Sequence, residues 1–176
     1  AWRWRCDTCG SLHDANAPPE ACPVCGAPAA CFQPAPATPP AEPAAALRVV
    51  IVGAGIAGVA AAETLRARSA GSRITLVSTE AELPYYRLNL TRYLAGEIAR
   101  DTLPLHPQAW YDQQDVRLLR GVAVDHLDPA AREVILADGR RLPYDRLILS
   151  AGSHPYVPPL PGIRLDGVFN LRTAAD

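Results

Sequence analysis

Lysine and methionine are both absent from this sequence. All 17 basic residues are therefore arginine, and with 18 acidic residues the formal net charge is −1. A charge so close to zero gives no general attraction to nucleic acid or to an anionic membrane surface, so we expect neither as a partner. Because no initiator methionine is present, we expect a processed or trimmed start.

Long hydrophobic runs are also missing. The longest, residues 49–62, is shorter than the roughly 20 residues that a membrane-spanning helix needs. The chain opens Ala-Trp-Arg-Trp-Arg-Cys, which lacks the apolar segment of a secretory signal. We expect a soluble, cytoplasmic protein.

Cysteine does not occur after Cys31. Cys6 and Cys9 form one C-x-x-C pair and Cys22 and Cys25 a second, each followed by glycine. A disulfide framework suits a small secreted protein, but nothing else here indicates secretion. Two such pairs can instead supply four thiolates in a tetrahedron, which suits Zn²⁺ or a single iron. Cys31 is expected to lie outside this set.

The segment around these cysteines, residues 1–32, is too short to bury enough apolar surface to fold alone. Metal binding is therefore expected to supply its folding free energy. The expected small core consists of Trp2, Trp4, Leu12 and Phe32.

The sequence of this segment resembles the short rubredoxin-like domain of rubrerythrins. The resemblance rests on Trp4-Arg5-Cys6-x-x-Cys9-Gly10, on residues 19–28 (Pro-Glu-x-Cys-Pro-Val-Cys-Gly-Ala-Pro) and on Phe32. It implies one redox-active iron held by four cysteines. Zinc is the alternative metal, since zinc ribbons use the same two cysteine pairs. Ser11 stands where the family often has tyrosine.

Proline and alanine dominate the next stretch, residues 33–46, which contains no large apolar residue. Such a composition predicts an extended tether rather than a packed element. The chain is thus expected to divide into a metal domain at 1–32, a linker at 33–46 and a second module at 47–176.

The second module begins with a glycine-rich fingerprint. An apolar strand at 49–52 is followed by Gly53, Gly55 and Gly58 in the spacing G-x-G-x-x-G, and then by an apolar helix pattern. The three glycines are expected to allow a tight turn, the approach of a pyrophosphate, and close packing of the helix. Glu80 ends a second strand and is placed to accept hydrogen bonds from a ribose. This pattern predicts a dinucleotide site in an α/β, Rossmann-like fold.

The remaining elements follow from local signals. Asp138-Gly139 is typical of a hairpin turn. We expect helices at 88–96 and 106–114, and strands at 74–78, 116–119, 122–127, 134–136 and 144–150.

This order of elements resembles the FAD half of reductases with two dinucleotide-binding domains, closest to the rubredoxin reductase and nitrite reductase flavoprotein branch. Besides the fingerprint, two blocks carry the resemblance. One is Pro-Tyr-Tyr-Arg at 84–87 with Leu-Ala-Gly at 94–96. The other is Tyr-Asp-Arg-Leu-Ile-Leu-Ser-Ala-Gly at 144–152 with the prolines that follow.

The resemblance implies roles for individual residues. Arg87 would lie near the pyrophosphate or the flavin, the backbone at Val124 would meet the adenine, and Ala151 and Gly152 would pass close to the cofactor. The ADP part of FAD would be held by Gly53, Gly55, Gly58 and Glu80.

Departures from the family pattern narrow the chemistry. Arg92 stands where the family often has a lysine near the flavin; arginine keeps the charge but cannot deprotonate. Ala151 stands where threonine is usual. With no cysteine after Cys31, thiol chemistry at the flavin is excluded.

The sequence contains no second G-x-G-x-x-G. We therefore expect NAD(P)H to bind a domain that this chain lacks. We also expect the chain to be the incomplete front part of a longer enzyme and not to be active alone.

The expected function is electron transfer from NAD(P)H through FAD to the fused iron centre and on to an acceptor protein. No catalytic side chain is assigned. One alternative is a reductase that serves another acceptor, such as a nitrite-reductase-type centre. A second is a zinc-ribbon docking module on a flavin-binding fragment.

Overall fold

The computed structural model describes residues 2–35 and 46–176 and divides into two compact units, residues 1–40 and 41–176. Most of the predicted linker, 33–46, lies outside the described residues, so its extended character stays a prediction. Its first residues belong to a strand, because β3 spans Phe32–Pro34.

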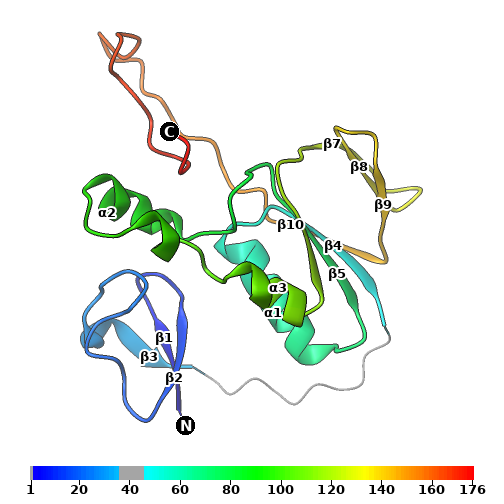
Figure 1. The fold of residues 1–176 in the computed structure, drawn as a ribbon, viewed down its shortest axis with the longest axis horizontal. Helices are drawn as coiled ribbons and strands as arrows, with labels where there is room; N and C mark the ends of the chain where they lie inside the picture. The colour runs from blue at the N-terminus through cyan, green and yellow to red at the C-terminus, as the bar shows by residue number, and fades with distance from the viewer. Residues whose placement is uncertain (1, 36–45) are drawn as a thin grey trace. The chain divides into compact units, whose positions relative to one another are not determined.

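The first unit is a three-stranded antiparallel sheet (blue in Figure 1). Its central strand β1, Trp2–Cys6, pairs with β2, Leu12–Ala15, on one edge and with β3 on the other. A single 3₁₀ turn, Ala29–Cys31, precedes β3. The sheet thus brings the first cysteine pair, at the end of β1, beside the residues that follow the second pair.

The expected core of this unit is partly wrong. Phe32 is buried and Trp4 packs against it, but Trp2 is 66% and Leu12 55% exposed. Leu12 pairs with Arg5, so it lies on the face of the sheet opposite Trp4 and Cys6. Trp2 lies on the correct face but at the far end of β1. The buried centre consists of Cys6, Cys22, Ala27 and Phe32.

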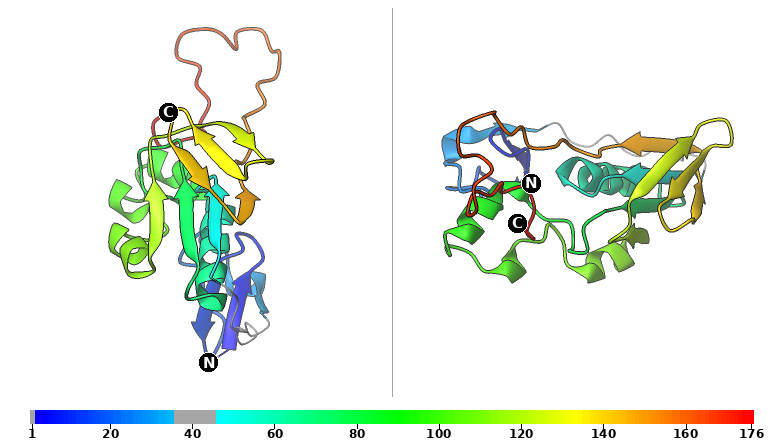
Figure 2. Two further views of the ribbon diagram at one scale, coloured as in Figure 1. Left: turned by 90° about the vertical axis from the view of Figure 1, so that its right-hand side faces the viewer. Right: turned by 90° about the horizontal axis from the view of Figure 1, so that it is seen from above.

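A four-stranded parallel sheet organises the second unit (Figures 1 and 2). The order β10-β4-β5-β6 places the first strand in the middle, with its successors on one side and the last strand on the other. This is the order of one half of a Rossmann fold, which confirms the predicted fold class. The bounds are Arg48–Val52 for β4, Arg73–Val77 for β5, Val116–Leu119 for β6 and Arg146–Leu149 for β10.

Helix α1, Ile56–Arg68, connects β4 to β5, and α3, Gln108–Gln113, precedes β6. The α3 helix is shorter than the predicted 106–114 because Pro107 caps it in an extended conformation. The predicted helix at 88–96 is also shorter. It begins as a 3₁₀ turn, Arg87–Asn89, and continues as α2, Leu90–Leu94. A third 3₁₀ turn spans Arg100–Thr102.

A second, antiparallel sheet contains β7, Val124–Asp128, β8, Glu133–Leu136, and β9, Arg141–Pro143 (yellow in Figure 2). The predicted turn connects β8 to β9. Gly139 adopts φ +85° there, a left-handed conformation that glycine adopts without strain.

The parallel sheet is buried on both faces. Val49 and Ile51 pack with α1 and α3, whereas Val50, between them in β4, packs with the antiparallel sheet. Alternate residues of one strand therefore face different layers, which explains why β4 reads as a continuous apolar run. Among residues 2–35 and 46–176, no helix has the length and apolarity to cross a membrane.

Candidate metal centre and dinucleotide site

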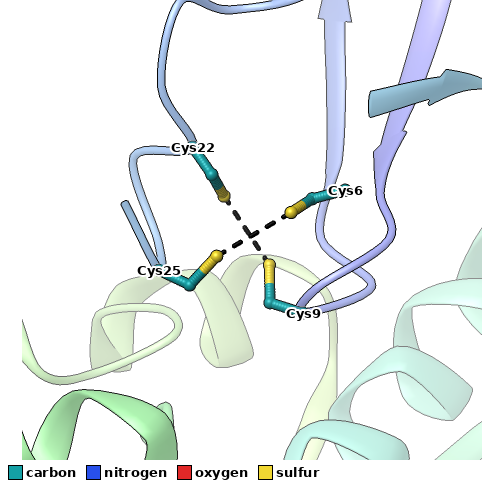
Figure 3. Close-up of side chains that lie close together, drawn as sticks. All are labelled: Cys6, Cys9, Cys22 and Cys25. Carbon is teal, nitrogen blue, oxygen red and sulfur yellow. Dashed lines mark hydrogen bonds between the residues drawn. The ribbon is translucent and has the colours of Figure 1, made fainter. Parts of the chain in front are cut away.

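The four predicted metal-ligating cysteines come together in the first unit, with their sulfur atoms all within 4.8 Å of one another. Figure 3 shows Cys6, Cys9, Cys22 and Cys25 pointing toward a common centre. The Sγ atoms of Cys6 and Cys25 lie 3.8 Å apart and those of Cys9 and Cys22 3.6 Å apart. A tetrahedron with metal–sulfur bonds of about 2.3 Å has sulfur–sulfur edges of about 3.8 Å. The cluster therefore has the size of a tetrathiolate metal site.

Two equivalent backbone turns present these sulfurs. The N–H of Gly10 donates to the carbonyl of Cys6 at 2.7 Å, and the N–H of Gly26 donates to that of Cys22 at 2.8 Å. Both glycines have positive φ, +77° and +75°, where a side chain would be strained. The glycine after each pair thus closes a knuckle around its two cysteines.

The electrostatics of the cluster favour a bound cation. Burial raises the pKa of the Cys25 thiol to about 12 and also raises the pKa of Cys6. For Cys22, burial acts in the same direction, but hydrogen bonds from the Ser11 hydroxyl and from the backbone N–H groups of Cys25 and Val24 lower the pKa overall. Four sulfurs in mutual contact cannot all ionise without a positive charge between them. A divalent or trivalent metal supplies that charge, so the residues fit a metal.

Cys31 lies outside the cluster. It ends the 3₁₀ turn before β3, and its carbonyl accepts a hydrogen bond from the N–H of Asp7 at 2.7 Å. Its backbone thus supports the first knuckle, and its partly buried side chain packs against the core of this unit.

A cavity of about 120 Å³ opens at the carboxyl ends of β4, β5 and β10 in the second unit. This is the edge at which open parallel sheets bind their ligands. Among the predicted cofactor-binding residues, those that line the cavity are Gly53, Gly55, Glu80, Arg87, Val124, Ala151 and Gly152.

The fingerprint glycines have distinct surroundings. A Cβ built at Gly53 would lie 2.2 Å from the carbonyl oxygen of Ser150, and one at Gly58 would lie 1.9 Å from that of Gly53. Gly58 is not among the residues that line the cavity. Its missing side chain lets α1 pack against the loop at Gly53. A Cβ at Gly55 would meet nothing within 4 Å. Because Gly55 caps the N-terminus of α1 at the cavity, the open space there fits a pyrophosphate.

Glu80 has close partners within the protein. One carboxylate oxygen accepts a hydrogen bond from the Tyr85 hydroxyl, and the other pairs with the Arg87 guanidinium. Burial and the bond to Glu80 raise the pKa of Tyr85 to about 12. A carboxylate offers about four lone-pair sites, so Glu80 keeps the capacity to accept from a ribose as well.

The same network extends to the end of the chain. Arg87 donates to the carbonyl of Arg172 at 2.6 Å, and the N–H of Ala174 donates to the Tyr85 hydroxyl at 2.9 Å. Arg172 lines the cavity, although no local sequence signal indicated it.

Ser150 fixes the turn of the fingerprint, a role that the sequence analysis did not predict. Its hydroxyl donates to the carbonyl of Gly53 at 2.8 Å.

Arg92 is not brought to the cavity. It lies near the end of α2, where its guanidinium donates to Glu97 at 3.2 Å. The turn at Gly96, with φ +73°, brings these two side chains together on the surface of this segment. The predicted approach of Arg92 to a flavin stays a prediction.

Comparison with known proteins assigns both units. Residues 47–176 match the family of pyridine nucleotide-disulphide oxidoreductases, and residues 4–33 match the rubredoxin-like domain of rubrerythrin. The first family implies FAD, and a rubredoxin-like domain with four cysteines implies a metal ion. The family name refers to disulfides, but this chain has no cysteine after Cys31.

Similar proteins are longer than this chain. Rhodocoxin reductase of Rhodococcus erythropolis is 38% identical over 131 residues, which are 74% of this chain and 31% of that protein. The assimilatory nitrate reductase electron transfer subunit of Bacillus subtilis is 34% identical over 73% of this chain and 17% of its own length. The solved structure of NADH:rubredoxin oxidoreductase from Clostridium acetobutylicum aligns with a TM-score of 0.58 at 27% identity, over 66% of this chain and 30% of that one.

The chain therefore spans about a third or less of the length of these relatives. Its sheet order, its glycine loop and the family match over residues 47–176 agree with one another. The chain belongs to the pyridine nucleotide-disulphide oxidoreductase family and carries a rubrerythrin-type rubredoxin-like domain at its start.

Proposed function

We propose that this chain is part of an electron-transfer flavoenzyme in which NAD(P)H is the electron source and the four-cysteine centre holds iron that receives the electrons. The observation that carries the proposal is the presence of both sites in one chain: a tetrathiolate cluster of the right size and a cavity built on a dinucleotide fingerprint. The printed names of two relatives, rhodocoxin reductase and NADH:rubredoxin oxidoreductase, support a reductase that serves a small redox protein.

In this proposal the residues of the chain bind and orient FAD. Gly55 and the start of α1 receive the pyrophosphate, Glu80 accepts from the ribose, and Arg87 supplies positive charge beside both. Val124, Ala151 and Gly152 form the walls of the cavity. When bound, FAD supplies the ability to take up a hydride and to release electrons singly.

A different acceptor is the second candidate. The similarity to the Bacillus subtilis assimilatory nitrate reductase electron transfer subunit favours it, because that protein is named for delivering electrons to another enzyme. In this case the metal of the cysteine cluster would be peripheral to the path of the electrons.

The metal content of the purified chain tests the proposal. When the protein is produced with iron and zinc both available, we expect one iron per chain and a red ferric tetrathiolate spectrum that bleaches on reduction. Zinc alone under iron-replete conditions would contradict the electron-carrier role and favour the docking module.

Two cysteine variants provide a matched control. Cys9→Ser should lose most of the bound iron, because its sulfur is part of the cluster. Cys31→Ser should keep the iron, because Cys31 lies outside the cluster. Elemental analysis of both variants makes the comparison, and equal loss of iron from both would mean that Cys31 contributes to the site.

A further inference from the structure

The hydroxyl of Ser11 lies against two of the four sulfurs. Its oxygen is 3.0 Å from the Sγ of Cys9 and 3.3 Å from that of Cys22. Ser11 follows the first knuckle directly, and its carbonyl accepts a hydrogen bond from the N–H of Cys6 at 2.9 Å. The same backbone that closes the knuckle therefore fixes the position of this hydroxyl.

A third polar neighbour, His13, lies beside the same hydroxyl. The Nε2 atom of His13 lies 2.8 Å from the Ser11 oxygen. His13 pairs with Trp4 across β1 and β2, which places it on the Cys6 face of the sheet, and its ring meets the edge of Phe32 with centroids 5.5 Å apart. The ring is thereby held with Nε2 toward Ser11.

Metal binding fixes the sulfurs as acceptors. A thiolate that ligates a metal carries no hydrogen and can only accept. When His13 donates its Nε2 hydrogen to the Ser11 oxygen, the serine hydroxyl is left to donate to a sulfur. Cys9 is the nearer of the two sulfurs, and Cys22 is the second.

We propose that Ser11 is a positioning residue of the metal centre: its hydroxyl donates a hydrogen bond to the Cys9 thiolate, with Cys22 as a second acceptor, and thereby raises the reduction potential of bound iron. This inference rests on the proposed function in so far as the metal is iron. A tetrathiolate carries one more negative charge when its iron is reduced, so a donor at sulfur stabilises the reduced state more strongly. Hydrogen bonds to the sulfurs are among the factors that set such potentials.

The test is a redox titration of the iron-loaded chain and its variants, followed through the visible spectrum. Ser11→Ala should lower the reduction equilibrium constant about tenfold, which is a potential about 59 mV more negative for one electron. Leu12→Ala is the matched control. Leu12 is the next residue, but its side chain lies on the face of the sheet opposite Cys6, so this substitution should leave the potential unchanged. An unchanged potential in Ser11→Ala would overturn the inference.

A second pair of variants guards against a failure of Ser11→Ala to load metal. Ser11→Thr and Ser11→Val have nearly the same shape, and only threonine keeps the hydroxyl. Threonine should hold the potential near that of the unmodified chain, whereas valine should lower it. Equal potentials in the two would also overturn the inference.

Cobalt separates this inference from the proposed function. Co²⁺ binds tetrathiolate sites whichever metal the protein takes up during production. Its sulfur-to-metal charge-transfer band should move when Ser11 loses its hydroxyl and stay in place in Leu12→Ala. If the purified chain contains only zinc but this cobalt band moves, the iron proposal fails and the hydrogen bond stands. If iron is present but neither the band nor the potential changes, the role of Ser11 fails alone.

Discussion

The carboxylate of Glu80, which the sequence analysis predicts to bind a ribose, is bonded to two neighbouring side chains. Tyr85 donates to one oxygen and Arg87 pairs with the other, and both also contact residues near the end of the chain. These contacts orient the carboxylate along the cavity wall and leave part of its acceptor capacity free. Removing the carboxylate therefore tests its predicted role as a ribose acceptor.

Glu80→Ala should weaken binding of FAD. A hydrogen bond to a charged group contributes about 1.5–3 kcal/mol, so the dissociation constant should rise by a factor of at least about ten. Fluorescence titration of the chain with FAD measures it. Glu133→Ala is the control, since Glu133 pairs with Arg141 on the antiparallel sheet, away from the cavity. Equal FAD affinity in both variants would contradict the assignment of Glu80.

Two fingerprint glycines allow a sharper comparison with the same substitution. Gly55→Ala should fold normally, because its Cβ meets nothing within 4 Å, but it should weaken FAD binding by obstructing the pyrophosphate. Gly58→Ala should lower the free energy of unfolding by about 1–3 kcal/mol, because its Cβ would lie 1.9 Å from the Gly53 carbonyl oxygen. Urea denaturation and FAD titration of both variants check this division. A destabilised Gly55→Ala with normal FAD affinity would contradict it.

On the scale of elements, an ion pair joins the starts of two neighbouring strands. The N–H of Arg48, at the start of β4, donates to Asp145 at 2.7 Å, and the guanidinium of Arg48 adds a bond of 2.8 Å. In return, the N–H of Asp145 donates to the carbonyl of Arg48, also at 2.8 Å. This contact fixes β10 beside β4 just before their parallel pairing begins.

The contact predicts a pH dependence of stability. Hydrogen bonds from Arg48 lower the pKa of Asp145 to about 2 from an ordinary value of 3.8. Because the folded-state pKa is depressed, the stabilisation is complete above about pH 4 and is lost as the pH falls toward 2. Asp145→Asn should therefore be less stable than the unmodified chain at pH 7, and the difference should shrink through this window.

Denaturation by urea at several pH values from 2 to 7 measures the effect. Its control is the same substitution in an Arg48→Gln background, where the pH-dependent difference should be smaller but not absent, because the backbone N–H of residue 48 still donates to Asp145. A difference in stability between the Asp145→Asn variant and the unmodified chain that stays constant from pH 7 to pH 2 would show that the ion pair does not contribute.

On the scale of the whole molecule, the metal cluster and the dinucleotide cavity belong to separate compact units. Each unit buries its own core: the cysteine cluster with Phe32 in the first, and the two layers around the parallel sheet in the second. The proline- and alanine-rich segment at 33–46 predicts a tether between them. Such a tether would hold the two sites at an effective concentration in the millimolar range, so the proposed electron transfer would not require tight binding between the units.

We predict that the 176-residue chain binds its metal but does not oxidise NAD(P)H, because its sequence holds one G-x-G-x-x-G and no second. Joined to a nicotinamide-binding domain and loaded with FAD and iron, it should show flavin reduction followed by iron bleaching in stopped-flow absorbance. The bleaching rate should be independent of protein concentration if the electrons pass within one chain. A rate that rises with concentration would mean transfer between molecules.

The sequence alone determined the features that depend on local spacing. Two C-x-x-C-G knuckles fix where four sulfurs can point, and a strand followed by G-x-G-x-x-G fixes where a helix N-terminus meets a loop, because each involves only a few consecutive residues. The hairpin turn at Gly139 followed from the same kind of signal.

Only the tertiary structure decided which distant side chains meet. Ser11 reaches Cys22 because two knuckles face each other, and Arg172 enters the cavity because the chain returns to Arg87. Arg92 pairs with Glu97 instead of lining the cavity. Leu12 is exposed because the strand register places it opposite Arg5. Composition and spacing carry no information on such contacts, since they depend on strand register and on how loops from separate elements pack together.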